Sequence, residues 1–119
     1  MSPDEMKIYW NDPWIYDRLE WLLENRPKDT ERLFLENPNK LLELLCMKVK
    51  QAWLVQQARE KRGQDSSRAA DAAFEEVISP PSENRPKKQL PEEFQQKVKD
   101  WLLNLPSSRP QTETTESEP

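Results

Sequence analysis

The positions of proline and glycine constrain the fold of this chain most strongly. Its 119 residues include eleven prolines and a single glycine, Gly63. Almost all of the prolines lie between the stretches with helical periodicity or in the first turn of one, where the missing amide hydrogen costs little. One glycine leaves few of the tight turns that join antiparallel strands. The sequence therefore predicts an all-α fold, and its length suffices for one small helical bundle.

Proline and capping residues predict where the helices begin and end. Asp12 before Pro13 is typical of a helix start. Arg26 before Pro27 is expected to end that helix, because the residue before proline disfavours helical geometry. Asp29–Thr30 then predicts the cap of the next helix. The expected helices cover residues 4–10, 13–25, 30–36, 39–62, 66–78 and 91–105.

The helix expected over 39–62 is the longest and should be the central helix of the bundle. One broad face carries most of its apolar residues, which are Leu41, Leu42, Leu45, Cys46, Val49, Ala52 and Trp53. Four further apolar residues fall outside this face, namely Leu44, Met47, Leu54 and Val55. A helix with apolar side chains on several sides needs cover on several sides. We therefore expect an obligate protein partner or a homodimer.

Composition divides the chain into four parts. Hydrophobic residues make up 34% of the chain, below the roughly 45–50% of a typical globular protein, so part of the chain should not be packed. A helical bundle over 1–78 should be followed by a proline-rich linker over 79–90. An amphipathic helix over 91–105 and a disordered tail over 106–119 complete the predicted organisation.

The C-terminal amphipathic helix has the clearest apolar pattern in the sequence. Its narrow stripe consists of Phe94, Val98, Trp101, Leu102 and Leu105. An amphipathic helix that follows a linker is typical of a segment that fills a groove. The sequence leaves open whether that groove lies on a second protein or on the bundle of the same chain.

An aromatic cluster near the N-terminus is a second candidate for partner binding. It consists of Tyr9, Trp10, Trp14 and Trp21. Large aromatic residues often supply the core of a short chain. They also serve as exposed anchors at protein interfaces. The sequence favours the core and leaves the interface as the alternative.

The sequence offers little for catalysis. It contains no histidine, which is the commonest general base and metal ligand. Its one cysteine, Cys46, falls on the main apolar face of the central helix and should be structural. The adjacent pairs Glu75–Glu76 and Glu92–Glu93 point about 100° apart around a helix, so neither pair converges on one site. We expect no enzyme activity, no cofactor, no metal and no small-molecule substrate.

Charge makes nucleic-acid binding the less favoured alternative. The net charge is −4, and one basic block over 46–62 is flanked by acidic segments. A contact with DNA or RNA would use Lys48, Lys50, Lys61 and Arg62. These residues do not share one side of the helix, whereas nucleic-acid-binding domains usually carry a clear basic face.

The remaining features bear on location. No segment approaches the ~18 uninterrupted apolar residues of a membrane span. The acidic N-terminus lacks the apolar run of a signal peptide. A single cysteine forms no disulfide within the chain, which fits a reducing compartment. We therefore expect a cytoplasmic protein that does not bind membranes.

Two function classes follow from these observations. The leading hypothesis is a non-catalytic protein–protein interaction or adaptor protein that acts through the bundle and the C-terminal helix. The alternative is a small helical nucleic-acid-associated regulator that uses the basic end of the long helix. A salt titration of binding distinguishes the two hypotheses, because contacts with nucleic-acid phosphates weaken steeply as the salt concentration rises.

Overall fold

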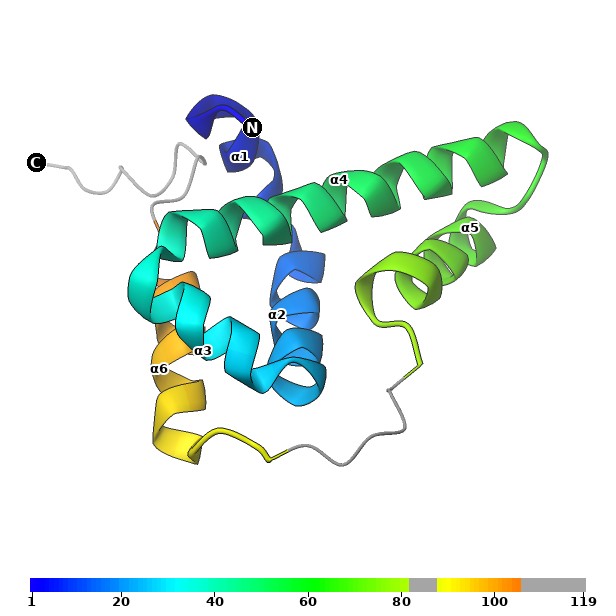
Figure 1. Cartoon of the computed structure of the whole chain (residues 1–119). Coiled ribbons are helices and arrows are strands. Elements are labelled where there is room, and N and C mark those ends of the chain that lie inside the picture. Colours follow the sequence, from blue (N-terminus) through cyan, green and yellow to red (C-terminus); the bar gives the residue numbers. More distant parts are fainter. Residues whose placement is uncertain (82–87, 106–119) are drawn as a thin grey trace, which may run out of the picture.

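The computed structural model describes residues 1–81 and 88–105, and this part of the chain folds into helices without a β-strand (Figure 1). The elements are α1 (Pro3–Tyr9), α2 (Pro13–Asn25), α3 (Pro27–Glu36), α4 (Pro38–Lys61), α5 (Ser66–Ala73), the π-helical turn η1 (Phe74–Ile78) and α6 (Glu92–Leu103). The predicted all-α fold around a long central helix is confirmed. Part of the predicted linker, 82–87, and the predicted disordered tail, 106–119, lie outside the described residues.

Local sequence accounts for most of the helix starts. Proline stands in the first turn of α1, α2, α3 and α4, where no amide hydrogen bond is lost. The Asp12 carboxylate accepts a hydrogen bond from the Trp14 amide at 2.8 Å, and the Asn37 side chain accepts one from the Lys40 amide at 3.2 Å. These caps satisfy amide groups that have no partner inside the helix.

The predicted start of the third helix at Asp29–Thr30 is wrong. Helix α3 begins at Pro27, and Arg26 is the cap residue of both α2 and α3. Proline has a φ angle preset for a helix and no amide hydrogen to satisfy, so it starts a new helix where it stops the previous one. Thr30 lies inside α3, where its buried hydroxyl donates to the Arg26 carbonyl at 2.8 Å.

The last predicted helix of the bundle changes geometry partway. Helix α5 is regular and then widens into the π-helical turn η1. Nη1 of Arg18, on α2, donates hydrogen bonds to the carbonyl oxygens of Val77 and Ile78, both at 3.2 Å. These bonds supply partners for carbonyls at the end of the helix. The end of η1 is therefore held by a side chain from a distant part of the sequence.

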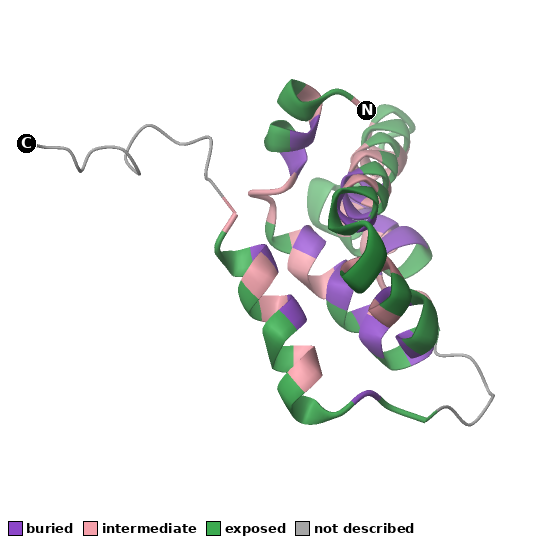
Figure 2. Cartoon of the chain, turned by 60° about the vertical axis from the view of Figure 1, so that its left-hand side comes forward, coloured by how far each residue is buried: buried purple, intermediate pink, exposed green. Residues whose placement is uncertain are grey.

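Helix α4 is the structural centre of the bundle. It contacts α1, α2, α3, α5 and η1. Its buried residues are Leu41, Leu42, Leu45, Cys46, Val49 and Ala52, six of the seven predicted for its main face. The seventh, Trp53, is partly buried and donates from Nε1 to Asp12 at 2.9 Å. Figure 2 shows the buried residues concentrated where the helices meet, and the exposed ones on their outer sides.

The chain reverses direction after α4 at Gly63. This residue has a φ angle of 94°, in the region that L-residues rarely adopt. Helix α5 then runs back along the C-terminal half of α4 (Figure 1). Its Ala69 and Ala73 are completely buried, and side chains this small let the two helices approach closely. The paired ends of α4 and α5 form an arm that extends from the rest of the bundle.

Helix α6 packs on the bundle of the same chain, against α2. Its Val98 and Leu102 are buried within the core cluster. The ring of Phe34, on α3, stands edge-on to Phe94 and Trp101, with ring centroids 5.7 and 5.5 Å apart. Such edge-to-face geometry is favourable for aromatic pairs. The stripe predicted for partner binding therefore faces its own chain.

We expect Val98→Ala to lower the free energy of unfolding by about 1–3 kcal/mol, because it removes buried methyl groups and leaves a cavity. The matched change Leu103→Ala affects a side chain of the same helix that is 64% exposed. It should change the free energy by less than about 0.5 kcal/mol. Urea titration followed by circular dichroism measures both variants. Equally small effects would contradict the docking of α6 on the core.

Cys46 lies in the centre of the core and is fully buried. Its thiol donates to the Met6 carbonyl, with 3.5 Å between sulfur and oxygen. Burial, with a smaller effect from the charge of Glu43, raises the pKa of the Cys46 thiol to about 12. The reactive thiolate is therefore scarce in the folded protein at neutral pH.

We expect Ellman's reagent at pH 8 to modify Cys46 only as fast as the protein unfolds, and a rapid reaction of the native protein would contradict its burial.

The raised pKa of Cys46 also makes stability depend on pH. The pKa of an ordinary thiol is 9.0, so between about pH 9 and 12 the folded state keeps a proton that the unfolded state releases. Stability from this group should be complete below pH 9 and fall through that window by at most about 1.4 kcal/mol per pH unit. Cys46→Ala should remove that part of the decline.

Candidate functional site

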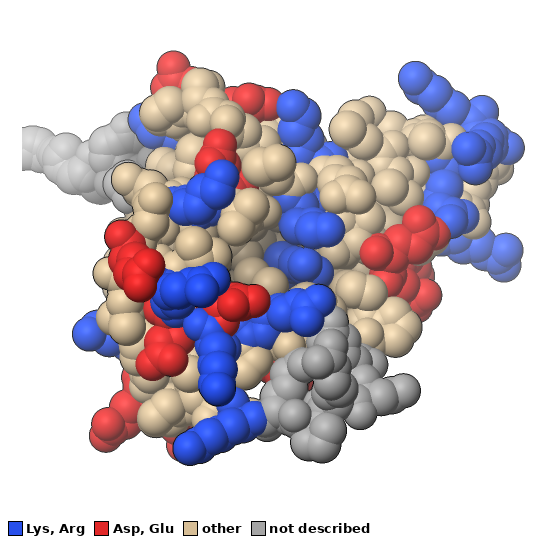
Figure 3. Space-filling model, in the orientation of Figure 1, with Lys and Arg blue, Asp and Glu red and all other residues tan. Residues whose placement is uncertain are grey.

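A groove runs along one side of α4. Its volume is about 940 Å³, and residues of α2, α3, α4 and the N-terminal segment line it. We call it the α4 groove. Figure 3 shows it as a hollow in the middle of the molecule, with basic side chains gathered around it. The α4 groove combines an apolar stripe with a strongly basic border.

The apolar stripe consists of Leu44, Met47 and Leu54, which are 36%, 49% and 55% exposed. With Gln51 between them, their spacing of three and four residues is the spacing of a helix–helix seam. The same residues were singled out in the sequence because they fall outside the buried face of the long helix. The described part of the chain leaves all three partly exposed. The fourth, Val55, is partly buried against the core.

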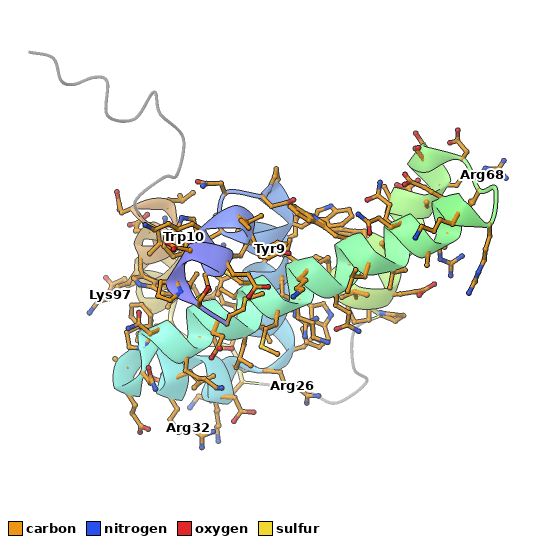
Figure 4. The ribbon with its side chains drawn as sticks, turned by 90° about the horizontal axis from the view of Figure 1, so that it is seen from above. Tyr9, Trp10, Arg26, Arg32, Arg68 and Lys97 are labelled. Atoms are coloured by element: carbon orange, nitrogen blue, oxygen red, sulfur yellow. The ribbon has the colours of Figure 1, made fainter. Side chains whose placement is uncertain are left out.

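Charge is distributed unevenly around the α4 groove. The basic residues that line it are Arg18, Arg26, Arg32, Lys48 and Lys50, and the acidic ones are Glu5 and Asp29. The two acids already have partners, since Lys50 lies 2.7 Å from Glu5 and Arg32 lies 3.4 Å from Asp29. Figure 4 shows Arg26 and Arg32 on the same side of the molecule. The lining as a whole is basic.

Arg18 is the basic residue most deeply built into the fold. It is 8% exposed, and its guanidinium lies over the Trp21 ring at 4.3 Å from the centroid. One end of the guanidinium holds the carbonyls of η1, while Nε is buried without a hydrogen-bond partner. Burial, and next the nearby charge of Arg26, lower the pKa of Arg18. This group is therefore a buried cation without an acidic partner among the described residues.

Lys48 follows Met47 on α4 and is partly buried in the α4 groove. Burial, and next the charge of Arg18, lower the pKa of Lys48. No acidic side chain of residues 1–81 or 88–105 forms an ion pair with it. Lys50, two residues later, is different, because its bond to Glu5 raises the pKa of Lys50.

None of the four aromatic residues predicted as an alternative anchor is exposed. Tyr9 packs on Trp53 with ring centroids 4.7 Å apart, and Trp21 donates from Nε1 to a backbone carbonyl at 2.8 Å. Both are 8% exposed or less. Trp10 and Trp14 are partly buried against the core. The structure does not bring the four predicted residues into one exposed surface.

The four basic residues predicted for nucleic-acid contact also divide into two groups. Lys48 and Lys50 line the α4 groove. Lys61 and Arg62 are exposed at the other end of α4, about 20 Å away along the helix axis at 1.5 Å per residue. Arg68 marks that far end in Figure 4. A single surface of four cations is not formed.

Sequence reasoning missed three basic residues: Arg18 and Arg32 lie in helices expected to supply the core, and Arg26 lies at an expected helix end. For Arg18 a signal was present, since an arginine stands between Ile15 and Leu22 on the apolar stripe of its helix. An unpaired charge on an apolar face indicates a buried partner or a ligand.

Comparison of the chain with protein-family models, with curated proteins and with solved structures finds no match. Of the helices that the structure describes, none has the length and apolar character needed to cross a membrane. In the same residues, no three cysteine, aspartate or glutamate side chains gather into a group that could hold a metal ion. The feature of the described structure that bears most on function is the α4 groove.

Proposed function

We propose that this chain is a non-catalytic protein-binding module that takes an amphipathic helix of a partner protein in the α4 groove. The observation that carries the proposal is the exposed stripe of Leu44, Met47 and Leu54 within a groove. Helices that dock in grooves are held by apolar anchors at the same three- and four-residue spacing.

The contrast between α4 and α6 supports the choice of surface. The stripe of α6 already has a cover, because Val98 and Leu102 are buried in the core cluster. The stripe of α4 is only partly covered by the described residues. Single exposed apolar side chains are ordinary, whereas a row of them in a groove is typical of an interaction site. The bundle, rather than the C-terminal helix, is therefore the proposed binding surface.

Charge favours a partner protein over a second copy of this chain. In a symmetric dimer built on the α4 groove, the basic linings of two copies would face each other. Like charges across an interface cost free energy. A partner helix with acidic flanks avoids this repulsion and gains from the same charges. The homodimer expected from the sequence is thus the second choice of occupant.

Nucleic-acid binding remains the runner-up. It would use Lys61 and Arg62, which are exposed at the far end of α4. The division of the four predicted residues between two places counts against a phosphate-tracking surface. The apolar stripe also has no role in such a contact.

We expect the double variant Met47→Ser, Leu54→Ser to weaken partner binding by about 10-fold or more, because buried apolar anchors carry most of the affinity of an interface. The matched control Leu35→Ser, Leu103→Ser also removes two exposed apolar side chains, at residues that do not line the α4 groove. It should bind as the unchanged protein does. Affinity capture from the native host identifies the partner, and calorimetry with the purified partner measures the affinities.

Light scattering of the same proteins tests whether a second copy of the chain occupies the α4 groove. A dimer that the Met47→Ser, Leu54→Ser variant loses and the control keeps would show that a second copy occupies the α4 groove. If the two double variants bind every partner equally, the α4 groove is not the binding surface. Binding to DNA or RNA that survives both double variants would favour the runner-up.

A further inference from the structure

The base of the α4 groove holds two cations that the described fold does not neutralise. Arg18 comes from α2 and Lys48 from α4, so they approach from different elements. The carboxylates of Glu5 and Asp29 are engaged by Lys50 and Arg32. Arg18 has a buried Nε–H group without a partner and is more than nine-tenths buried. A buried donor without a partner costs free energy that a suitable ligand recovers.

The two cations act on each other as well. The charge of Arg18 contributes to the lowered pKa of Lys48, and Arg26 does the same to Arg18. Repulsion of this kind is relieved by an anion placed between the charges. Arg18 is buried and Lys48 is partly buried, so their attraction to a bound anion is stronger than the attraction between the same charges in water.

We infer that Arg18 and Lys48 form a carboxylate site, which receives an aspartate or glutamate side chain of the partner helix that lies on the apolar stripe. This inference rests on the proposed function and adds the chemistry of the partner. Its place in the groove is defined by Lys48, which flanks the seam formed by Leu44, Met47 and Leu54. Residues that flank such a seam form the ion pairs that choose a partner and its orientation.

The choice of a carboxylate over a phosphate follows from the neighbours. Leu33, Leu44 and Met47 line the same groove as the two cations. An amphipathic helix can cover these apolar side chains and present an acid beside them. A nucleic-acid backbone would leave them uncovered. The expected partner segment therefore has apolar residues at seam spacing and an acid next to one of them.

The test uses a displayed library of helical peptides with leucine at seam positions and random residues at the flanking positions. The full chain is the target. We expect selected peptides to be rich in aspartate or glutamate at one flanking position. Replacing that acid by its amide should weaken binding about 10-fold or more, as expected for the loss of a charged hydrogen bond.

Lys48→Met is the variant of choice, because Arg18 also holds η1 and its replacement would disturb the fold. Lys48→Met should weaken binding of the acidic peptide about 10-fold and leave binding of the amide peptide unchanged. Lys61→Met removes the same charge from the far end of the same helix and should not change the affinity for either peptide. A thermal melt checks that both variants are folded.

The outcomes separate this inference from the proposed function. Peptides that depend on Met47 and Leu54 but show no acidic preference overturn the carboxylate site and leave the proposed function in place. An equal loss with Lys48→Met and Lys61→Met also overturns it, because general attraction would then explain the preference. If no selected peptide depends on Met47 and Leu54, the proposed function fails. A labelled DNA duplex or RNA strand that competes with the peptide and requires Lys48 would make phosphate the ligand and overturn the inference.

Discussion

The bundle depends on the packing of one face of α4. The helices α1, α2, α3 and α5 and the turn η1 all contact this helix, and buried residues such as Leu45 and Val49 fill the space between them. A chain with 34% hydrophobic residues has too few apolar side chains to cover a long helix on every side. One side of α4, with Leu44, Met47 and Leu54, stays partly exposed and forms a wall of the α4 groove.

Arg18 connects this core to the α4 groove. Its guanidinium donates to the carbonyls at the end of η1 and lies over Trp21, and Arg18 is among the residues that line the groove. The positive charge at the base of the groove is thus held by the fold rather than by a mobile surface side chain. The protein as a whole has a net charge of −4, so the groove is a basic region on an acidic molecule. A charge distribution of this kind makes the groove the part of the surface most favourable for anionic groups.

Helix content and most helix starts could be predicted because their causes are local. Asp12 with Pro13 and Asn37 with Pro38 cap and start α2 and α4 within a few residues of sequence. Pro27 shows the limit of this reasoning, since the same residue ends one helix and starts the next. The widening of α5 into η1 was not predictable, because the arginine that holds it lies about sixty residues earlier in the chain.

The sequence by itself determined that the chain is helical, that α4 is its longest helix and that Leu44, Met47 and Leu54 fall outside the main buried face. It did so because periodicity and capping act over one or two turns. Only the tertiary structure decided that this second face stays open, that α6 packs on α2, and that Arg18 and Lys48 meet in one groove. Burial and charge pairing depend on which helices are neighbours in space, and neighbours far apart in the sequence leave no local pattern.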